Sequence, residues 1–470
     1  MKLSYKIKEK GGAGDEFNIQ IRRLLIPIVL QNILSAAVSS ADVLMLNYVG
    51  QSSISAVSLA TQYANVLFMV YSGLGSGAAI LCAQYFGKGD MRAIDVIKGI
   101  AMRFSLLFSI IFAGLAAFAP GLMMKLFTDD TELIALGSSY LRIISISYLC
   151  WGIIEVYLAI LRSIGRVVVC TVLNTMTFSL NILLNAVFIF GLFGAPKLGV
   201  IGVAAATSFS RVLELTGCIL VSFFSQDVKL RPADLFLRNP LLFKDFMKIS
   251  LPALGNNIVW SVAFSMYSVI IGHLGSDAVA ANSFASVVRS FGTILCHGIA
   301  SAGGILLGKI LGENRLEEAL TVSKRLIKMS VFGGLFGGVV ILAATPLALQ
   351  FADLTDTAMH YLKNMLLINT YYVMGTALNT TFIACIFRAG GDSRFGFICD
   401  IFDMWCYAVP LGFLAAFVLK LPVMWVYFLL CTDEFVKWPW IIKHYRSKKW
   451  LHNITRDDLF VKEGGGEHEM

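Results

Sequence analysis

Carboxylates inside long apolar stretches are the residues of this chain with the most evident chemistry. Asp42 lies within the apolar run 26–50, and Asp400 and Asp403, three residues apart on one helical face, lie within another. A carboxylate is costly to bury away from water, and in a partly apolar cavity it can exchange a proton near neutral pH. We therefore expect Asp42 to bind H⁺, or Na⁺ where oxygen ligands surround it. The alternative is a structural aspartate hydrogen-bonded to serines and asparagines.

Polar amides and one glutamate form a second group of candidates. Asn181 and Asn185 are four residues apart, which places them on one face of a helix. Glu155 could pair with Arg162 or Arg166 near the end of its own helix. The other amides within apolar stretches, each of which could instead bridge two helices, are Gln31, Asn32, Asn256, Asn257 and Asn379.

Motifs for catalysis or nucleotide binding are missing from the sequence. The glycine-rich run 73–77 lacks the following Lys-Ser/Thr of a phosphate-binding loop, and close helix packing explains it better. The nine cysteines are scattered, no CxxC pair occurs, and His297 is expected to be a packed, neutral histidine. We expect no enzyme, no cofactor and no metal other than a possible Na⁺ at Asp42.

The elements that must position these residues are membrane helices. Of the 470 residues, 57% are hydrophobic and only 14% are charged, whereas a soluble chain has about a quarter charged residues. The apolar runs are continuous and long enough to cross a bilayer as helices. Twelve spans are expected, at residues 24–48, 54–84, 96–121, 132–159, 167–194, 198–224, 249–274, 278–308, 327–350, 358–386, 395–419 and 421–443.

Basic residues gather in every second loop and at both ends of the chain. Because such residues favour the cytoplasm, we expect both termini to lie inside, in a multi-pass protein of the plasma (inner) membrane. The same bias explains the net charge of +8, so no nucleic-acid partner is expected. Without an ATP site, transport across the membrane would be driven by an ion gradient or be passive.

The chain contains an internal duplication at an offset of 225 residues. Residues 26–50 return at 251–275, where Pro27 falls on Pro252 and Asp42 falls on Tyr267. Two six-helix halves that start and end on one side are related by an axis along the membrane normal. The organisation expected is an N-terminal segment 1–23, halves 24–224 and 249–443, a linker 225–248 that could form an interfacial helix, and a tail 444–470 on the inner membrane face or disordered.

The sequence resembles the MATE (multidrug and toxic compound extrusion) transporters of the bacterial NorM/DinF-like kind. The resemblance covers roughly residues 20–445 and rests on five stretches. They are Pro27, Asn32, Asp42 and Gly50 in the first span, and then the runs 83–90, 181–191, 199–207 and 387–396. It implies an all-α fold of two six-helix bundles in a V. It also implies export of cationic, amphipathic compounds in exchange for H⁺ or Na⁺, by alternating access.

The resemblance also assigns roles to individual residues. In relatives, cation binding centres on the first-helix aspartate, here Asp42, with contributions that fall on Asn181, Asn185 and Thr207. Some relatives have an aspartate where this chain has Asn185, and others have a glutamate where it has Trp260. A second-half cation site of the latter kind is therefore not expected, although Asp400 could compensate. Candidates for the substrate cavity are Gln31, Asn32, Glu155, Asn257, Trp260, Asn379, Asp400 and Asp403.

Our interpretation is an ion-coupled exporter, expected to work as a monomer in the lipid bilayer. One alternative is an exporter of another metabolite, and another is a flippase for lipid-linked saccharides. Cavity arginines would favour the flippase, and the arginines available for that role are Arg142, Arg211 and Arg289. A membrane-embedded enzyme or a receptor is the alternative of a different class, and no catalytic spacing supports it.

Overall fold

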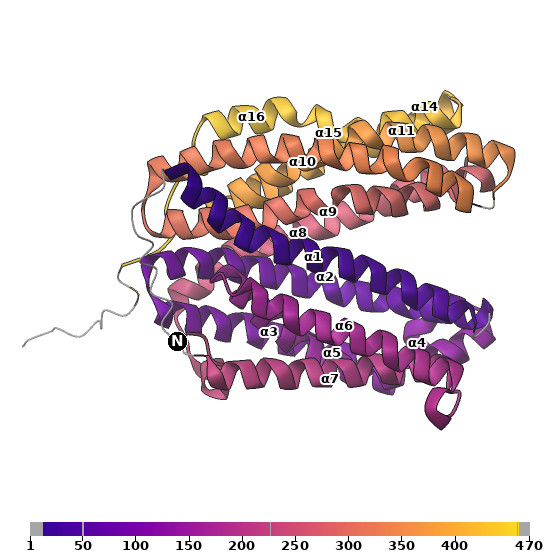
Figure 1. Cartoon of the computed structure of the whole chain (residues 1–470), viewed down its shortest axis with the longest axis horizontal. Helices are drawn as coiled ribbons and strands as arrows, with labels where there is room; N and C mark the ends of the chain where they lie inside the picture. Colours follow the sequence, from indigo (N-terminus) through magenta and orange to yellow (C-terminus); the bar gives the residue numbers. More distant parts are fainter. Residues whose placement is uncertain (1–12, 49–50, 226, 353, 458, 460–470) are drawn as a thin grey trace, which may run out of the picture.

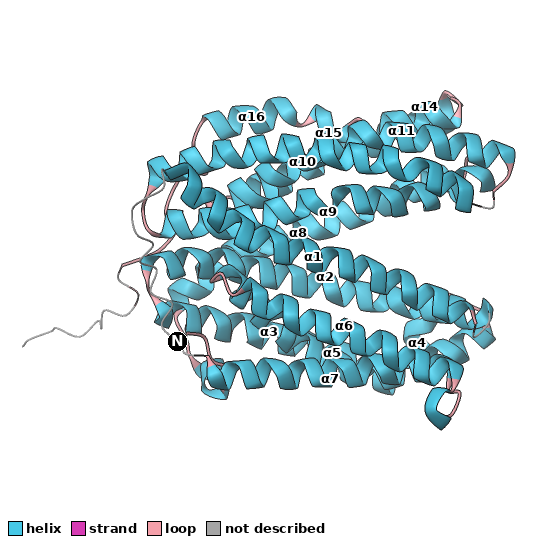
Figure 2. Ribbon diagram, viewed as in Figure 1, coloured by secondary structure: helices cyan, strands magenta, loops and turns pink. Residues whose placement is uncertain are grey.

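The computed structural model describes residues 13–48, 51–225, 227–352, 354–457 and 459. Its described part consists of helices joined by loops, with no strand (Figure 2). The first half contains α1 (Ala13–Asn47), α2 (Gln51–Lys88), α3 (Met91–Phe118), α4 (Pro120–Lys125), α5 (Thr131–Ser163), α6 (Val167–Phe190) and α7 (Gly199–Phe224). These helices contain the first six expected spans.

The second half begins with α8 (Pro240–Gly272), α9 (Ser276–Gly312), α10 (Leu316–Phe351) and α11 (Asp356–Asn379). It continues through α12 (Ser393–Asp400), α13 (Val409–Phe413), α14 (Val423–Leu430), α15 (Asp433–Val436) and α16 (Trp438–Arg446). Three stretches are π-helical, at Thr380–Phe387, Ile401–Ala408 and Leu414–Val418.

Ten spans in the described residues are long and apolar enough to cross a membrane. The two other expected spans, 358–386 and 421–443, are also helical but more polar. The first is α11 with its π-helical continuation, and the second is broken into α14, α15 and α16. The fold is the expected all-α membrane fold.

The helices form two bundles that meet at one end and diverge at the other (Figure 1). We call α1–α7 the first bundle and α8–α16 the second bundle. The end where they meet is called the closed end, and it carries the beginning of α1, the α2–α3 and α9–α10 turns and the end of α16. Contacts between the bundles are made by α2 with α8 and α9, and by α1 with α9.

The contacts between bundles repeat the internal duplication of the sequence. A side chain at Gly87 would overlap the carbonyl oxygen of Lys309, and one at Gly312 would overlap that of Gln84. Each residue of the second contact is 225 positions from its counterpart in the first. Glycine is therefore required twice, at two equivalent places where α2 and α9 approach each other closely.

The first helix of each half begins against the opposite bundle. Phe17 and Ile21 of α1 are buried in a core formed with the second bundle. Leu242 and Phe246 of α8 are buried in a core formed with α2, α3 and α5 of the first bundle. At the closed end the two bundles are thus joined by the linker, by the start of α1 packed on the second bundle, and by the start of α8 packed on the first.

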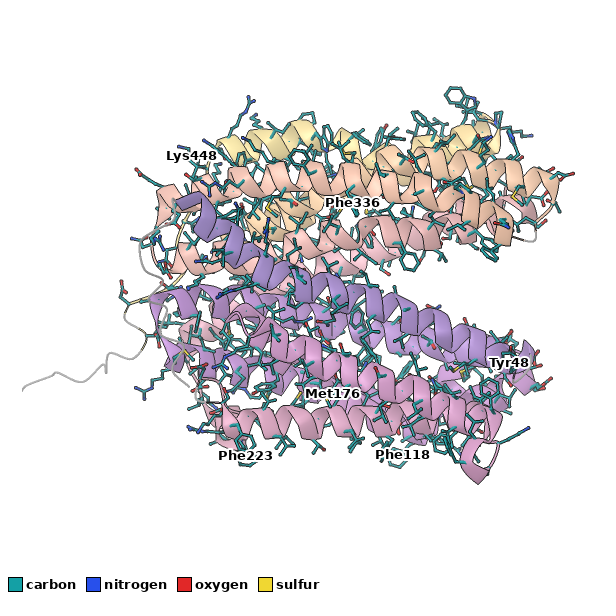
Figure 3. All side chains as sticks on the ribbon, viewed as in Figure 1. Tyr48, Phe118, Met176, Phe223, Phe336 and Lys448 are labelled. Carbon is teal, nitrogen blue, oxygen red and sulfur yellow. The ribbon has the colours of Figure 1, made fainter. Side chains whose placement is uncertain are left out.

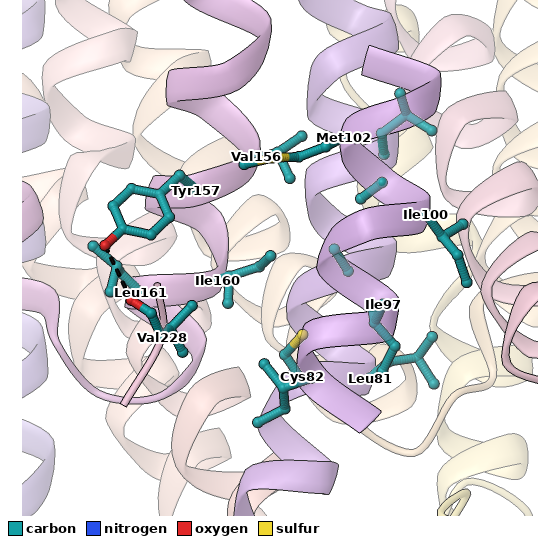
Figure 4. Close-up of a cluster of buried hydrophobic side chains, with 14 of the residues drawn as sticks. Leu81, Cys82, Ile97, Ile100, Met102, Val156, Tyr157, Ile160, Leu161 and Val228 are labelled. Carbon is teal, nitrogen blue, oxygen red and sulfur yellow. Dashed lines mark hydrogen bonds between the residues drawn. The ribbon is translucent and has the colours of Figure 1, made fainter. Parts of the chain in front are cut away.

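The linker packs into the first bundle more deeply than a surface segment would. Val228 is fully buried, and its carbonyl accepts a hydrogen bond of 3.3 Å from Tyr157 in the core (Figure 4). Asp234, in the short 3₁₀ turn Pro232–Phe236, contacts the buried ammonium of Lys98 at 2.9 Å. The outer surfaces carry large apolar side chains such as Met176, 66% exposed, and Phe223, 76% exposed (Figure 3). A bilayer would cover such side chains.

Candidate functional site

A cavity of about 410 Å³ lies between the two bundles. It is lined by α1, α2, α5, α9 and the π-helical stretch after α11. Of the cavity candidates, Gln31, Asn32 and Glu155 line it. Asn257 donates at 3.2 Å to the hydroxyl of Ser72, which lines the cavity. Trp260 does not line it and instead contacts Phe264, one turn further along α8, with tilted rings and 4.3 Å between ring centroids.

Charged groups in the cavity wall are few and partly paired. Arg162 contacts Glu155 at 3.2 Å, which is one of the two ion pairs anticipated for that glutamate. Arg166 instead contacts Asp227. Arg388 also lines the cavity and donates to Asn256 at 2.8 Å. Among the described residues, the cavity wall therefore contains two arginines and one already paired carboxylate.

The first bundle holds a line of polar side chains between α6 and α7. Asn185 donates to the amide oxygen of Asn181 at 3.3 Å, and Asn181 donates to the hydroxyl of Thr207 at 3.2 Å. Asn181 and Asn185 are buried, so their oxygens are preoriented acceptors. The backbone of Asp42 belongs to α1, which packs on α6, but its side chain lies outside the described residues.

The second bundle contains a buried cluster of charges centred on Lys437. Its ammonium lies 3.3 Å from Asp400, 3.1 Å from Asp403 and 3.4 Å from Glu434. Each of these four side chains is at most 7% exposed. Asp400 and Asp403, expected in the cavity, therefore lie within the second bundle and do not line the cavity.

Polar neighbours surround this charge cluster. Asn256 donates to Asp400 at 2.6 Å and thereby connects the cluster to Arg388 in the cavity wall. Asn379, another candidate that does not line the cavity, donates to Glu434. Two of the helical segments involved are irregular, since Asn379 precedes one π-helical stretch and Asp403 lies in another. Such turns frequently occur at functional sites.

The cluster contains more carboxylates than cations. Asp433 adds a fourth carboxylate and accepts a hydrogen bond of 3.0 Å from Tyr267. Within the described residues Lys437 is the cation that contacts this cluster, so one ammonium faces three of the four carboxylates. An unpaired buried charge costs several kcal/mol, so the physically favoured state has at least one carboxyl group protonated.

Asp403 contacts the ammonium of Lys437 at 3.1 Å but lacks hydrogen-bond donors among the described residues. Neither of its oxygens accepts a hydrogen bond within the described part of the chain, although Asp403 is only 2% exposed. Within the same residues, no group of three or more His, Cys, Asp or Glu side chains is arranged to hold a metal ion.

Sequence reasoning missed Asp433, Glu434 and Lys437. The signal was present, because these are three ionisable residues within five positions of the expected span 421–443, and Glu434 and Lys437 are three apart on one helical face. The duplication gives a second signal. Tyr267, the counterpart of Asp42, is hydrogen-bonded to Asp433, so a carboxylate from α15 lies beside the equivalent position of the second bundle.

The MatE family model matches residues 27–187 and 252–414, one segment in each half. Over 90% of its length the chain is 24% identical to an uncharacterized transporter, YisQ of Bacillus subtilis (strain 168), of which it covers 93%. It is also 24% identical to a probable multidrug resistance protein, NorM of Thermotoga maritima, with 96% and 97% of the two chains covered.

Solved structures share the fold at lower identity. An outward-facing MATE family transporter of the MOP superfamily aligns with a TM-score of 0.81 and 22% identity, over 94% of this chain and all of that one. A MOP superfamily transporter from Pyrococcus furiosus, described as having a binding pocket of reverse polarity, aligns with a TM-score of 0.82 and 20% identity. It covers 93% of this chain and 99% of the other.

Proposed function

The chain belongs to the MatE family, whose members are transporters and not enzymes, and we propose that it exports small organic compounds in exchange for H⁺. The termini would lie in the cytoplasm, and export would proceed by alternating access to the cavity between the bundles. The observation that carries the proposal is the surplus of buried carboxylates around Lys437, apart from the cavity.

Proton uptake at such a cluster changes the free energies of the two states of the transporter by different amounts. A ligand shifts a conformational equilibrium only by its differential affinity for the two states. The cluster joins α8, the π-helical stretch after α12, and α15, so a change in its charge alters how these segments pack. Through Asn256 the same cluster reaches Arg388 in the cavity wall, which links proton binding to the substrate site.

Asp42 is the second proton site of this proposal. In this arrangement Asn181, Asn185 and Thr207 stabilise the aspartate and the cation that it binds. Support comes from the buried amide line between α6 and α7, and from the packing of α1 on α6. Exchange of H⁺ at Asp42 would act on the first bundle as the cluster around Lys437 acts on the second.

The walls of the cavity favour an amphipathic substrate. Ile28, Phe68 and Ile80 supply apolar surface, while Gln31 and Asn32 supply amide donors and acceptors. A cationic substrate would depend on Asp42 for attraction, since the described carboxylate of the wall, Glu155, is already paired with Arg162.

An anionic amphipathic substrate, such as a lipid-linked phosphate, is a second candidate. It is favoured by Arg162 and Arg388, which line the cavity from opposite bundles and lie 226 positions apart; among the described residues Arg388 has no carboxylate partner there, whereas Arg162 contacts Glu155. The three arginines expected within spans contribute less. Arg211 is paired with Glu214, and Arg289 packs against Phe264 and Tyr372 inside the second bundle.

Transport in proteoliposomes tests the proposal. Efflux of ethidium is followed while a pH gradient or a Na⁺ gradient is imposed separately, on wild type, Asp42→Asn and the control Asp129→Asn. Asp129 is an exposed carboxylate in the turn before α5. We expect the pH gradient to drive efflux by wild type and the control, and Asp42→Asn to abolish it. Efflux driven by Na⁺ alone would refute proton coupling.

The same vesicles separate the two substrate classes. Movement of a fluorescent anionic phospholipid analogue, without movement of ethidium, would favour the second candidate over the first. In that case Arg162→Gln should reduce the movement at least tenfold, because a charged hydrogen-bond partner contributes about 1.5–3 kcal/mol.

A further inference from the structure

The chain segment that follows α16 crosses from the second bundle to the first at the closed end. Its described residues are 447–457 and 459. We expected this tail to lie on the membrane face or to be disordered. The structure instead places it across the line where the bundles meet.

The beginning of the segment is fixed to its own bundle. Trp450 is fully buried, and its ring stacks on Tyr445 of α16 with 5.7 Å between centroids. A side chain at Gly390 would overlap the carbonyl oxygen of Trp450, so the two backbones are in close contact. Asn453 then donates to the carbonyl of Gly312 at the end of α9, at 3.3 Å.

The next residues bind the first bundle. The amide of Ile454 donates to the side chain of Gln84 at 2.9 Å, and that of Arg456 donates to the hydroxyl of Tyr85 at 3.3 Å. Lys88, at the end of α2, contacts both the carbonyl of Arg456 and the carboxylate of Asp457 at 2.6 Å. The last five residues of α2, 84–88, thus supply three partners for the segment.

The outer part of the segment is held by two more contacts. The guanidinium of Arg456 binds both carboxylate oxygens of Asp245, near the start of α8, at 2.6 and 2.9 Å. Leu459 is 7% exposed in the core of the first bundle, and its carbonyl accepts a hydrogen bond of 2.9 Å from Asn239. The start of α8 packs on the first bundle, so both contacts attach the segment to that side.

We propose that residues 447–457, together with Leu459, form a latch that holds the bundles together at the closed end. This proposal rests on the proposed function, because alternating access requires the closed end to open. The anchor at Trp450 is buried and apolar, so it stays with the second bundle. The contacts of Arg456 and Lys88 with carboxylates are charged and partly exposed, so water can replace them when the bundles separate.

The side chain of Gln84 shows how the latch completes the closed end. Its amide nitrogen donates to the carbonyl of Ala389 in the second bundle at 2.7 Å. Its oxygen accepts from Ile454 of the latch. Gln84 is fully buried, so loss of the latch would leave its oxygen without this donor and weaken the direct contact between bundles.

Reversing the charges of one latch contact tests the proposal. Nitroxide labels are placed on cysteines introduced at the exposed positions Arg92 and Lys324, one on each bundle, with the exposed Cys406 replaced. Distances between the labels are measured by electron paramagnetic resonance in detergent. Arg456→Asp and Asp245→Arg should each add a longer-distance population, with the open-to-closed ratio increased about threefold to fivefold, the range expected for a partly exposed ion pair.

Matched variants make the test specific. The double variant Arg456→Asp, Asp245→Arg should restore the wild-type distances, and Lys449→Gln, an exposed residue of the same segment, should not change them. If Arg456→Asp fails to fold, Arg456→Gln replaces it with the same expected direction. An unchanged distance distribution in the single variants would overturn the latch. Because the distances need no substrate, a latch confirmed in detergent, for a protein that moves neither ethidium nor the anionic phospholipid in vesicles, would refute the proposed function alone.

Discussion

The surplus of carboxylates in the second bundle predicts unequal effects for two substitutions in one cluster. Lys437→Gln removes the ammonium that lies within 3.4 Å of three carboxylates. Asp403→Asn removes a carboxylate that accepts no hydrogen bond among the described residues and contacts only that ammonium, at 3.1 Å. We expect the lysine variant to be destabilised and the aspartate variant to be nearly as stable as wild type.

The expected magnitudes follow from burial. Removing one partner of a buried ion pair typically costs about 3–5 kcal/mol, because the remaining charge is left uncompensated. That cost applies to Lys437→Gln, since Asp400 and Glu434 would remain at most 7% exposed without the ammonium. If Asp403 already carries a proton, the neutral amide is a close mimic, and the expected cost is below about 1 kcal/mol, the value of one neutral hydrogen bond.

Thermal unfolding in detergent at pH 7, followed by tryptophan fluorescence, measures the contrast. The control is Lys443→Gln, because Lys443 is an exposed lysine of α16. Lys437→Gln should lower the unfolding temperature clearly, whereas Asp403→Asn and the control should leave it close to that of wild type. Equal destabilisation by Asp403→Asn and Lys437→Gln would show that Asp403 is ionised and paired, and would refute the argument for a proton there.

Three further predictions concern other parts of the chain. Asp42→Asn should insert and fold but lose efflux driven by a pH gradient, and wild-type efflux by this variant would exclude Asp42 as a proton site. Trp450→Ala should destabilise the protein by about 3–5 kcal/mol, measured by thermal unfolding, because the side chain is fully buried; an unchanged unfolding temperature would contradict its role as the anchor. Burial alone would raise the pKa of Asp392. Its contacts with His444 and the Phe395 amide outweigh that effect, so the pKa lies below the usual value. The stability that this carboxylate contributes is therefore present above its unfolded pKa, about 3.9, and is lost as the pH falls through the lower folded value. Asp392→Asn should make the unfolding temperature depend less on pH in that range. An unaltered dependence on pH would count against the contact.

Much of the fold follows from the sequence because its signals are local or repeated. Apolar runs of membrane length require helices, and the 225-residue repeat requires two similar halves. The reciprocal contacts of Gly87 and Gly312 are a direct consequence of that repeat. The helical nature of the span 421–443 was also predictable, although its division into three short helices was not.

The site was less predictable, because it depends on which helices meet. Gln31, Asn32 and Glu155 line the cavity between the bundles, whereas Asp400 and Asp403 face Lys437, which is distant in the sequence. An intramembrane lysine is recognised as a partner only when the packing of α15 against the segment after α12 is known. The path of the tail could not be predicted for the same reason, since its partners in α2, α8 and α9 come from distant parts of the chain.

Proton release on substrate binding tests the central claim most directly. Purified protein in weakly buffered detergent is mixed with ethidium, binding is confirmed by fluorescence, and a pH indicator records the protons released. Exchange of substrate for H⁺ predicts release by wild type, and loss of part of that release in Asp403→Asn and in Asp42→Asn. Binding of ethidium without release of protons, at a pH where the cluster is loaded, would contradict the account.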